Sequence, residues 1–450
     1  MAHFDTSGLQ PAQDRLTAEG IDVVRLGYAD LIGADRGRDV LVNRFARTVG
    51  SGVAFCRSVY GTTPRGGVVD IEGGLSDGLP DIQAFPDIAT LLPVPWEPGV
   101  AHCIADLYNP DGSPSQESPR YVLRQICEQY AELGLTPIVG PELEFYILEQ
   151  ADESPSGWKR YGEGTGNVYT SGLKGDPQNV LLNSLRLLGN YGLEVISANH
   201  EFSSGQFEIN LWHGEALDAA DRAHRFKSAV KELARQLGHL ATFMPKPFND
   251  EGGSGYHLHF SIWSEDQRAL FDGPDDPHGL SELARHAVGG ILEHAPALAA
   301  VSNPTINSYK RFGPDTLAPW LIDWGMDNRS AMVRIPPERG SASRMELRLG
   351  DASANSYLAI AGMLGAALLG IRNKTEPPEP LVGYGYDVTK SAKLPTSLGA
   401  ALDALEADSE FADLLGRPLV EAFVTYKRDE IERFSSWITD WEFHEYTYHI

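Results

Sequence analysis

Cysteine is scarce in this chain, which has only Cys56, Cys103 and Cys127 among 450 residues. Their odd number and wide spacing argue against a disulfide framework and against a cysteine-based metal site. We therefore expect a protein that works in a reducing compartment, and we predict that it is cytoplasmic.

Positive charge is also in short supply. The 37 lysines and arginines are outnumbered by 62 aspartates and glutamates, which gives a formal net charge of -25. The field of such a protein repels a phosphate backbone, and the sequence has no basic stripe that would offset this repulsion. We expect no nucleic-acid partner.

Long apolar runs and nucleotide-binding loops are missing too. The first ten residues, MAHFDTSGLQ, contain no basic segment followed by an apolar run, so we expect neither secretion nor a membrane span. The most apolar helix candidate, residues 357–371, is predicted to be short and interrupted by Gly362, Gly365 and Gly370. Since the pattern GxxxxGK[ST] does not occur, a bound nucleotide would not be held by a P-loop.

The composition, 42% hydrophobic and 22% charged, predicts one large domain with a smaller companion. Strand-like runs at residues 21–28, 37–42 and 100–107 indicate a β-rich N-terminal domain. A turn cluster at residues 109–114 precedes Ser118-Pro119, which opens a helix, so we divide the chain into domains 1–110 and 111–450. In the second domain, helices predicted to start near Asp176 and Leu217 alternate with single strands, which is typical of an α+β fold.

Four predicted strands repeat one pattern, a pair of polar residues spaced two apart. The pairs are Glu142 with Glu144, Glu208 with Asn210, His257 with His259, and Glu346 with Arg348. This spacing places each pair on one face of its strand. A single pair is more simply a half-exposed surface strand, but four pairs predict one polar wall. Neighbouring carboxylates are unfavourable without a cation, and carboxylates with a minority of imidazole are typical ligands of Mg²⁺ or Mn²⁺.

Six arginines lie between Arg311 and Arg348 in this otherwise acidic chain. A guanidinium group binds carboxylate or phosphate through two hydrogen bonds at once, so these residues indicate an anion site. A solvated charged surface is the alternative interpretation. Together with a divalent-ion site and the glycine-rich turn at residues 251–255, the arginines are chemically suited to phosphoryl transfer.

Six motifs then give a resemblance to a known family. In order they are PELEFYIL, NHEFSSGQFEINL, GGSGYHLHFS, NPTINSYKRF, NRSAMVRIP and RMELRLGDASANSYL. From about residue 15 to its end the chain resembles glutamine synthetase and the related γ-glutamyl-amine ligases. The resemblance implies an N-terminal β-grasp domain and a catalytic half-barrel of antiparallel strands flanked by helices. It also implies a homo-oligomer, a dodecamer of two hexameric rings with active sites between neighbouring subunits.

The resemblance assigns roles to individual residues. It implies one divalent ion, Mg²⁺ or Mn²⁺, held by Glu144, Glu201 and Glu208, and a second held by Glu142, His257 and Glu346, in a site for two or three ions. It implies that Arg311 and Arg348, assisted by the Gly253 backbone, bind glutamate. It places Arg329, Arg334 and His259 at the ATP phosphates, with Ser261 near the nucleotide, and makes Arg311, Arg329 and Arg348 catalytic.

The sequence departs from the ammonium-using relatives at two positions. The loop after the arginine matched by Arg311 carries a glutamate in those enzymes, and here that position is Leu317. A second carboxylate that handles ammonium falls at Cys56 in this chain. The resemblance implies an ATP-dependent ligase that activates the γ-carboxylate of glutamate as γ-glutamyl phosphate. Because neither Leu317 nor Cys56 balances an ammonium charge, we predict that this ligase joins glutamate to a primary amine. A polyamine, ethanolamine or another primary amine would fit, in amine catabolism or nitrogen metabolism.

Three other interpretations remain open at this point. The chain could be an ordinary glutamine synthetase that uses ammonium, although Leu317 and Cys56 disfavour this. Guanidino kinases resemble the catalytic domain, but the N-terminal domain and the NSYKRF motif favour the ligases. A catalytically idle regulatory homologue is the non-enzymatic alternative, and the complete set of motif residues counts against it.

Overall fold

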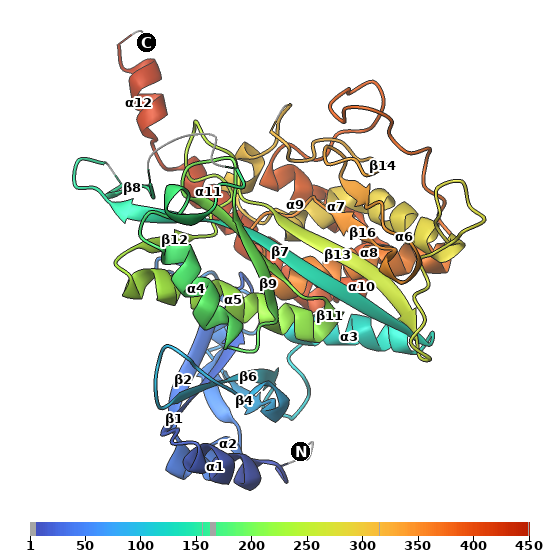
Figure 1. Cartoon of the computed structure of the whole chain (residues 1–450). Helices are drawn as coiled ribbons and strands as arrows, with labels where there is room; N and C mark the ends of the chain where they lie inside the picture. The colour runs from blue at the N-terminus through green and yellow to red at the C-terminus, as the bar shows by residue number, and fades with distance from the viewer. Residues whose placement is uncertain (1–5, 155, 163–167, 315, 449) are drawn as a thin grey trace.

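The structure is a computed structural model that describes residues 6–154, 156–162, 168–314, 316–448 and 450. Figure 1 shows two β-sheets, a smaller one built by the N-terminal part of the chain and a larger one that carries most of the helices. This arrangement confirms the predicted α+β class, with an N-terminal β-rich part and a catalytic part built on a large sheet.

The smaller sheet has the strand order β2-β1-β6-β4-β3, with β5 paired to β6. Its strands are β1 (Val23–Ala29), β2 (Asp35–Leu41), β3 (Val53–Cys56), β4 (Asp81–Pro86), β5 (Leu92–Pro93) and β6 (Val100–Tyr108). Strand β1 runs parallel to β6, and the other pairs are antiparallel. The helices α1 (Leu9–Ala18) and α2 (Phe45–Val49) and the short 3₁₀ turns η1 (Val42–Arg44), η2 (Arg57–Gly61) and η3 (Ile88–Thr90) complete this part.

The larger sheet has the order β14-β15-β16-β13-β7-β10-β9. Its long strand β7 (Leu135–Gln150) lies antiparallel between β10 (Gln206–Leu211) and β13 (Tyr256–Ser264). The remaining strands are β8 (Trp158–Arg160), β9 (Val195–His200), β11 (Gly214–Glu215), β12 (Leu240–Thr242), β14 (Trp324–Met326), β15 (Val333–Ile335) and β16 (Met345–Leu347). All described pairs in this sheet are antiparallel except β14 with β15.

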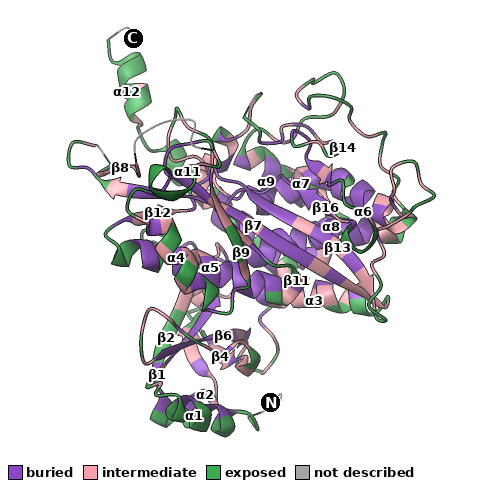
Figure 2. Cartoon of the chain, in the orientation of Figure 1, coloured by how far each residue is buried: buried purple, intermediate pink, exposed green. Residues whose placement is uncertain are grey.

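Helices pack behind this sheet around the buried helix α8, which contacts α3, α5, α6, α7 and α10 (Figures 1 and 2). The helices are α3 (Pro119–Ala131), α4 (Val180–Gly189), α5 (Ala216–Gln236), α6 (Glu282–Glu293), α7 (Ala295–Ser302), α8 (Ser356–Asn373), α9 (Leu398–Ala407), α10 (Ser409–Leu415), α11 (Arg417–Ser435) and α12 (Asp440–Tyr446). Three further 3₁₀ turns are η4 (Gly172–Lys174), η5 (Ile306–Lys310) and η6 (Gly340–Ala342). Helix α12 stands away from the body and is largely exposed in Figure 2.

The helix predicted to start at Asp176 begins four residues later, at Val180. Asn179, the residue before it, has a left-handed backbone conformation with φ of 56°, which a helix cannot continue through. Asp176 still serves the helix start, because its side chain accepts hydrogen bonds from the backbone amides of Val180 (2.8 Å) and Leu182 (3.0 Å).

Helix α8 corrects the expectation of a short helix interrupted by glycines, since it runs unbroken for 18 residues. A Cβ atom on Gly370 would lie 2.5 Å from the backbone nitrogen of Gly290 in α6, and one on Gly290 would lie 2.6 Å from that of Gly370. The two glycines thus let α6 and α8 cross with their backbones in contact. By length and composition α8 could also cross a membrane, but 83% of its 18 residues are buried inside the fold. The absence of a membrane partner remains a prediction.

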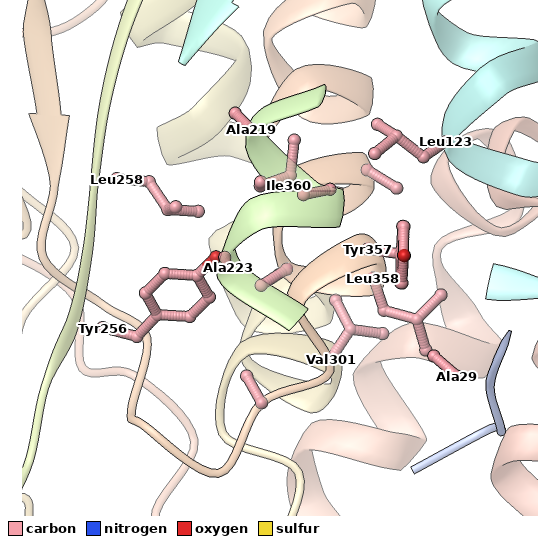
Figure 3. Packing of buried hydrophobic residues seen from close by; sticks show 14 of the residues in the cluster. Ala29, Leu123, Ala219, Ala223, Tyr256, Leu258, Val301, Tyr357, Leu358 and Ile360 are labelled. Carbon is pink, nitrogen blue, oxygen red and sulfur yellow. The ribbon is translucent and has the colours of Figure 1, made fainter. Parts of the chain in front are cut away.

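Figure 3 shows the core around α8. Tyr357 and Leu358 of α8 lie near Leu123 of α3, and Ala29 of the smaller sheet belongs to the same buried cluster. The Asn355 side chain donates to the backbone carbonyl of Asp30 over 2.9 Å, which is a second link between the two parts of the chain. The division at residues 110 and 111 remains a prediction.

Candidate active site

The polar residues of four strands meet across the centre of the large sheet. Glu142 on β7 lies opposite both Asn210 on β10 and His257 on β13. Two residues along β7, Glu144 lies opposite Glu208, and in the neighbouring β13–β16 pair His259 lies opposite Glu346 on the same face. The prediction that these four strands form one wall is confirmed, because the strand order β10-β7-β13-β16 brings all four pairs together.

Three carboxylate and imidazole groups are close enough to bind a single ion. One ligand atom each from Glu142, Glu208 and His257 lies within 4.8 Å of the others, and His257 Nδ1 is 2.8 Å from Glu142 Oε1. The resemblance assigns Glu208 to one ion, and it assigns Glu142 and His257 to the other. The three residues that lie closest together therefore come from both implied ion sites. The division of six ligands into two sets therefore remains a prediction, while their clustering is a feature of the fold.

The cluster carries more negative charge than its surroundings can balance. Burial, together with the charges of Glu142 and Glu144, raises the pKa of Glu208 to about 10. Burial and the charge of Glu144 raise the pKa of Glu201, which directly follows β9, to about 7. Carboxylate oxygens with one imidazole form a donor set that fits a hard divalent cation, and such a cation would relieve this repulsion.

Two amide side chains hold these carboxylates: Asn210, which the sequence places on the polar wall beside Glu208, and Gln206, which the sequence interpretation did not single out. Asn210 Nδ2 donates to Glu142 Oε2 over 2.9 Å and to Glu208 Oε1 over 3.2 Å. Gln206 Nε2 donates to Glu144 Oε2 and to the Gly253 carbonyl, both over 3.1 Å. The alternation that singled out Glu208 and Asn210 also places Gln206 on the same face, so the same signal could have found it.

Glu346 joins the carboxylates to the arginines. Arg334 Nη1 donates to Glu346 Oε2 over 2.7 Å, and Arg348 Nη1 donates to the other carboxylate oxygen. Arg348 also donates from Nε to the backbone carbonyl of Arg329 over 3.1 Å. Arg348 and Glu346 are buried, whereas the Arg329 side chain is exposed on the turn before β15.

Arg311 lies against the glycine-rich turn. It is buried, and its Nη1 donates to the carbonyl of Leu349 over 3.2 Å. A Cβ atom at Gly253 would lie 2.6 Å from Arg311 Cγ, so only glycine lets the arginine pass this close. The structure therefore places Gly253 and Arg311 together, as the glutamate-binding prediction requires.

A cavity of about 390 Å³ opens beside the carboxylate cluster and is lined by Glu142, His259, Ser261, Trp263 and Arg344 among others. His259 Nε2 lies 3.6 Å from Glu142 Oε2, and its Nδ1 accepts a hydrogen bond from Arg344 Nε over 3.3 Å. Ser261 accepts a hydrogen bond from Trp263. His259 and Ser261, both predicted to lie near the nucleotide, thus line one cavity. Arg329 and Arg334, predicted to face the ATP phosphates, are not part of its lining.

The two residues predicted to decide the amine lie in different parts of the chain. Leu317 lies on the loop after η5, is 44% exposed, and has a left-handed backbone with φ of 59°. Cys56 is exposed at the end of β3 in the smaller sheet, and its Sγ lies 3.0 Å from Ser58 Oγ. Within one chain, Leu317 follows Arg311 by six residues in the large domain, whereas Cys56 belongs to the smaller sheet.

Comparison with known proteins gives the family. Residues 116–446 match the model of the glutamine synthetase catalytic domain. The glutamine synthetase of Thermotoga maritima is 37% identical over 443 residues, covering 96% of this chain and 97% of its own. That of Halobacterium salinarum is 33% identical, covering 96% and 95%. A solved structure named GmaS/ADP complex is 32% identical with a TM-score of 0.86, covering 97% of this chain and 99% of its own.

These matches span nearly the whole chain and agree with the site geometry. The wall of carboxylates and imidazoles, the arginines beside it and the adjoining cavity occupy the matched catalytic domain. The chain belongs to the glutamine synthetase family, and it is an ATP-dependent glutamate ligase.

Proposed function

We propose that this ligase joins the γ-carboxylate of glutamate to a primary amine with a carbon chain, in preference to ammonium. The observation that carries the proposal is Leu317, an exposed apolar side chain on the loop that follows the buried Arg311. A carboxylate at this position would attract and balance an ammonium ion, whereas leucine offers only apolar surface. A polyamine, ethanolamine or another primary amine can pack its carbon chain against that surface.

In the first step an oxygen of the glutamate γ-carboxylate attacks the γ-phosphorus of ATP. The bond from that phosphorus to the ADP oxygen breaks, and γ-glutamyl phosphate forms. Arg311 and Arg348 would hold glutamate through paired hydrogen bonds, with the Gly253 backbone beside Arg311. Arg329, Arg334, His259 and Ser261 are proposed to bind or face the nucleotide and its phosphates.

The carboxylate cluster fits divalent ions by its donor chemistry. Glu144, Glu201 and Glu208 are proposed to hold one Mg²⁺ or Mn²⁺, and Glu142, His257 and Glu346 another, within a site for two or three ions. When bound, such ions neutralise negative charge on the ATP phosphates and on the transferring phosphoryl group.

In the second step the amine nitrogen attacks the acyl carbon of γ-glutamyl phosphate. Inorganic phosphate leaves with the electron pair of the carbon–oxygen bond, and the nitrogen loses a proton to give the amide. Among these steps only the choice of nucleophile depends on Leu317 and Cys56, so substitutions there should change the amine used and leave glutamate binding unchanged.

Ordinary glutamine synthetase, which uses ammonium, is the second candidate. The names of the curated relatives support glutamine synthetase, since those from Thermotoga maritima and Halobacterium salinarum are both called so. We further propose a cytoplasmic homo-oligomer, a dodecamer of two hexameric rings, in which Cys56 of one subunit could meet Leu317 of the next.

The test is phosphate release from ATP with glutamate and Mg²⁺ across a panel of amines that includes ammonium. We expect the best amine to exceed ammonium in kcat/KM by on the order of a thousandfold, since an unbalanced buried charge costs several kcal/mol. Leu317→Glu, alone or with Cys56→Asp, should raise ammonium use and weaken the best amine. Leu133→Glu, which adds the same charge at a similarly exposed leucine after α3, is the control.

Two results would overturn the proposal. If the wild type uses ammonium as well as any amine in the panel, the enzyme is a glutamine synthetase. If no amine in the panel supports phosphate release above the rate with ammonium, the assignment of a primary amine as the acceptor fails.

A further inference from the structure

A segment without regular secondary structure, residues 381–394, runs beside the loop that carries Leu317. Its backbone is fixed to residues 320–324 at both ends: Leu381 N donates to Trp324 O over 2.7 Å, and Leu394 N donates to Trp320 O over 3.1 Å. Between them Ile322 N donates to Ala392 O over 2.8 Å. We call residues 381–394 the strap, since both of its ends are attached to residues 320–324, which follow the loop.

Tyr386 is the strap residue that reaches the loop. Its hydroxyl donates to the carbonyl of Ala318 over 3.1 Å, directly after Leu317, and it also interacts with the side chain of Thr316 and the backbone of Leu317. The charges of Arg311 and Arg348 act on the same hydroxyl. Burial raises the pKa of Tyr386, so the hydroxyl stays protonated and remains a donor at working pH.

The loop needs such a contact because of its backbone. Leu317 has φ of 59°, a left-handed conformation that costs a residue with a side chain on the order of 1 kcal/mol and persists only where the surroundings hold it. The hydrogen bond from Tyr386 to Ala318 lies one residue away, in position to hold it.

The strap is anchored on its other side to the turn that carries Arg329. Gly385 N donates to Ser330 Oγ over 2.8 Å, and Asn328 Nδ2 donates to the Gly383 carbonyl over 2.7 Å. The carbonyl of Arg329, between Asn328 and Ser330, accepts the hydrogen bond from Arg348. One continuous set of contacts therefore runs from the buried Arg348 through the strap to the loop with Leu317.

We propose that Tyr386 is a positioning residue for the amine step, which fixes the loop 316–318 so that Leu317 forms one wall of the subsite for an alkylamine. This inference rests on the proposed function and names a residue that determines its selectivity. The hydroxyl contacts the loop and not the reacting atoms, so its loss changes how well the amine binds and leaves the first step intact.

The experiment compares Tyr386→Phe, Leu317→Ala and the double variant, using kcat/KM for the best amine and for ammonium together with KM for glutamate. Tyr386→Phe should raise KM for the amine about five- to tenfold, the value of one hydrogen bond, and lower the amine-to-ammonium ratio. KM for glutamate should stay within about twofold. In the Leu317→Ala background the same substitution should change the ratio less than about twofold, because the side chain that it positions is gone.

Tyr130→Phe is the matched control. The Tyr130 hydroxyl donates to the carbonyl of Leu364 over 2.8 Å in the helical core, so its loss should lower the melting temperature without moving the amine-to-ammonium ratio. Tyr386 loses its proposed role if Tyr386→Phe changes both acceptors equally, or if the effects of the two single substitutions multiply in the double variant.

Failure of the proposed function can be told apart from failure of the role proposed for Tyr386. A wild type that prefers ammonium overturns the amine assignment by itself. The coupling between Tyr386 and Leu317 is then measured with ammonium, where non-multiplicative effects support the positioning role and multiplicative effects overturn it.

Discussion

Arg334 and Glu346 lie directly opposite each other in the β15–β16 pair, and Arg334 Nη1 donates to Glu346 Oε2 over 2.7 Å. Burial opposes ionisation of Glu346, but the charges of Arg348 and His257 outweigh it and lower the pKa of this carboxyl to about 2. Glu346 is therefore an anion at working pH, and it links the arginines to the carboxylate cluster.

Glu346→Gln should lower turnover on the order of a hundredfold and raise the Mg²⁺ concentration needed for half-maximal rate, because a neutral amide is a poorer ligand. The measurement is phosphate release over a Mg²⁺ titration. Asp327→Asn is the control, since Asp327 is the exposed partner on the other side of Arg334, at 2.7 Å. If both variants behave alike, Glu346 serves Arg334 and not the ion.

Glu208→Gln separates stability from ion binding. Because burial beside Glu142 and Glu144 raises the pKa of Glu208 to about 10, this carboxyl keeps its proton without Mg²⁺, and a neutral amide in its place should leave the melting temperature without Mg²⁺ unchanged or higher. The stabilisation that Mg²⁺ gives the wild type should disappear. Thermal unfolding with and without Mg²⁺ checks both effects, with Glu149→Gln on the neighbouring strand β7 as the control. Undiminished stabilisation by Mg²⁺ in Glu208→Gln would remove Glu208 from the ligands.

Arg348→Lys should lower kcat/KM for glutamate about ten- to a hundredfold, although it conserves charge. A lysine ammonium cannot donate to Glu346 and the Arg329 carbonyl while also holding a substrate carboxylate through two bonds. Steady-state kinetics in glutamate measures this loss. Arg339→Lys is the comparison within the same stretch, because Arg339 donates only to backbone carbonyls in the described contacts. An unchanged kcat/KM in Arg348→Lys contradicts its assignment.

Asp323 gives a prediction about pH and stability. Burial raises its pKa from 3.8 to about 6, and its Oδ2 has no hydrogen-bond partner among the described residues. The folded state thus holds a proton that the unfolded state releases, so this residue's contribution to stability falls as pH rises from about 4 to 6. Asp323→Asn should raise the melting temperature by about 1–3 °C at pH 7.5 and by less at pH 4.5. An equal shift at both pH values would exclude this cause.

The wall of the candidate site was predictable because its signal is local. Spacing of two along a strand fixes which face Glu142, Glu208 and His257 share, and it needs no knowledge of the partner strand. Their convergence did depend on strand order, which the sequence pattern does not contain. Gln206 was missed although the same spacing applies to it. The interpretation looked for charged and imidazole side chains as ion ligands, and an amide is neither.

Tyr386 could not have been found in this way. The strap has no helical or strand periodicity, and its position follows from backbone hydrogen bonds to residues 320–324, some 60 residues earlier in the chain. The helix α8 was misjudged for a related reason. Glycine in a sequence indicates a weak helix, but contact with another helix can reverse that preference.

The contact between Gly290 and Gly370 has a consequence for how this chain can vary. Most pairs of core residues can exchange volume, so that enlarging one is compensated by shrinking the other. Here both partners are already the smallest residue, and the atoms in contact are backbone. Neither position can compensate for the other, so in a deep mutational scan each site should reject every side chain, whatever residue the other site carries. Second-site suppressors should occur only at positions where a substitution shifts the whole of α6 or α8.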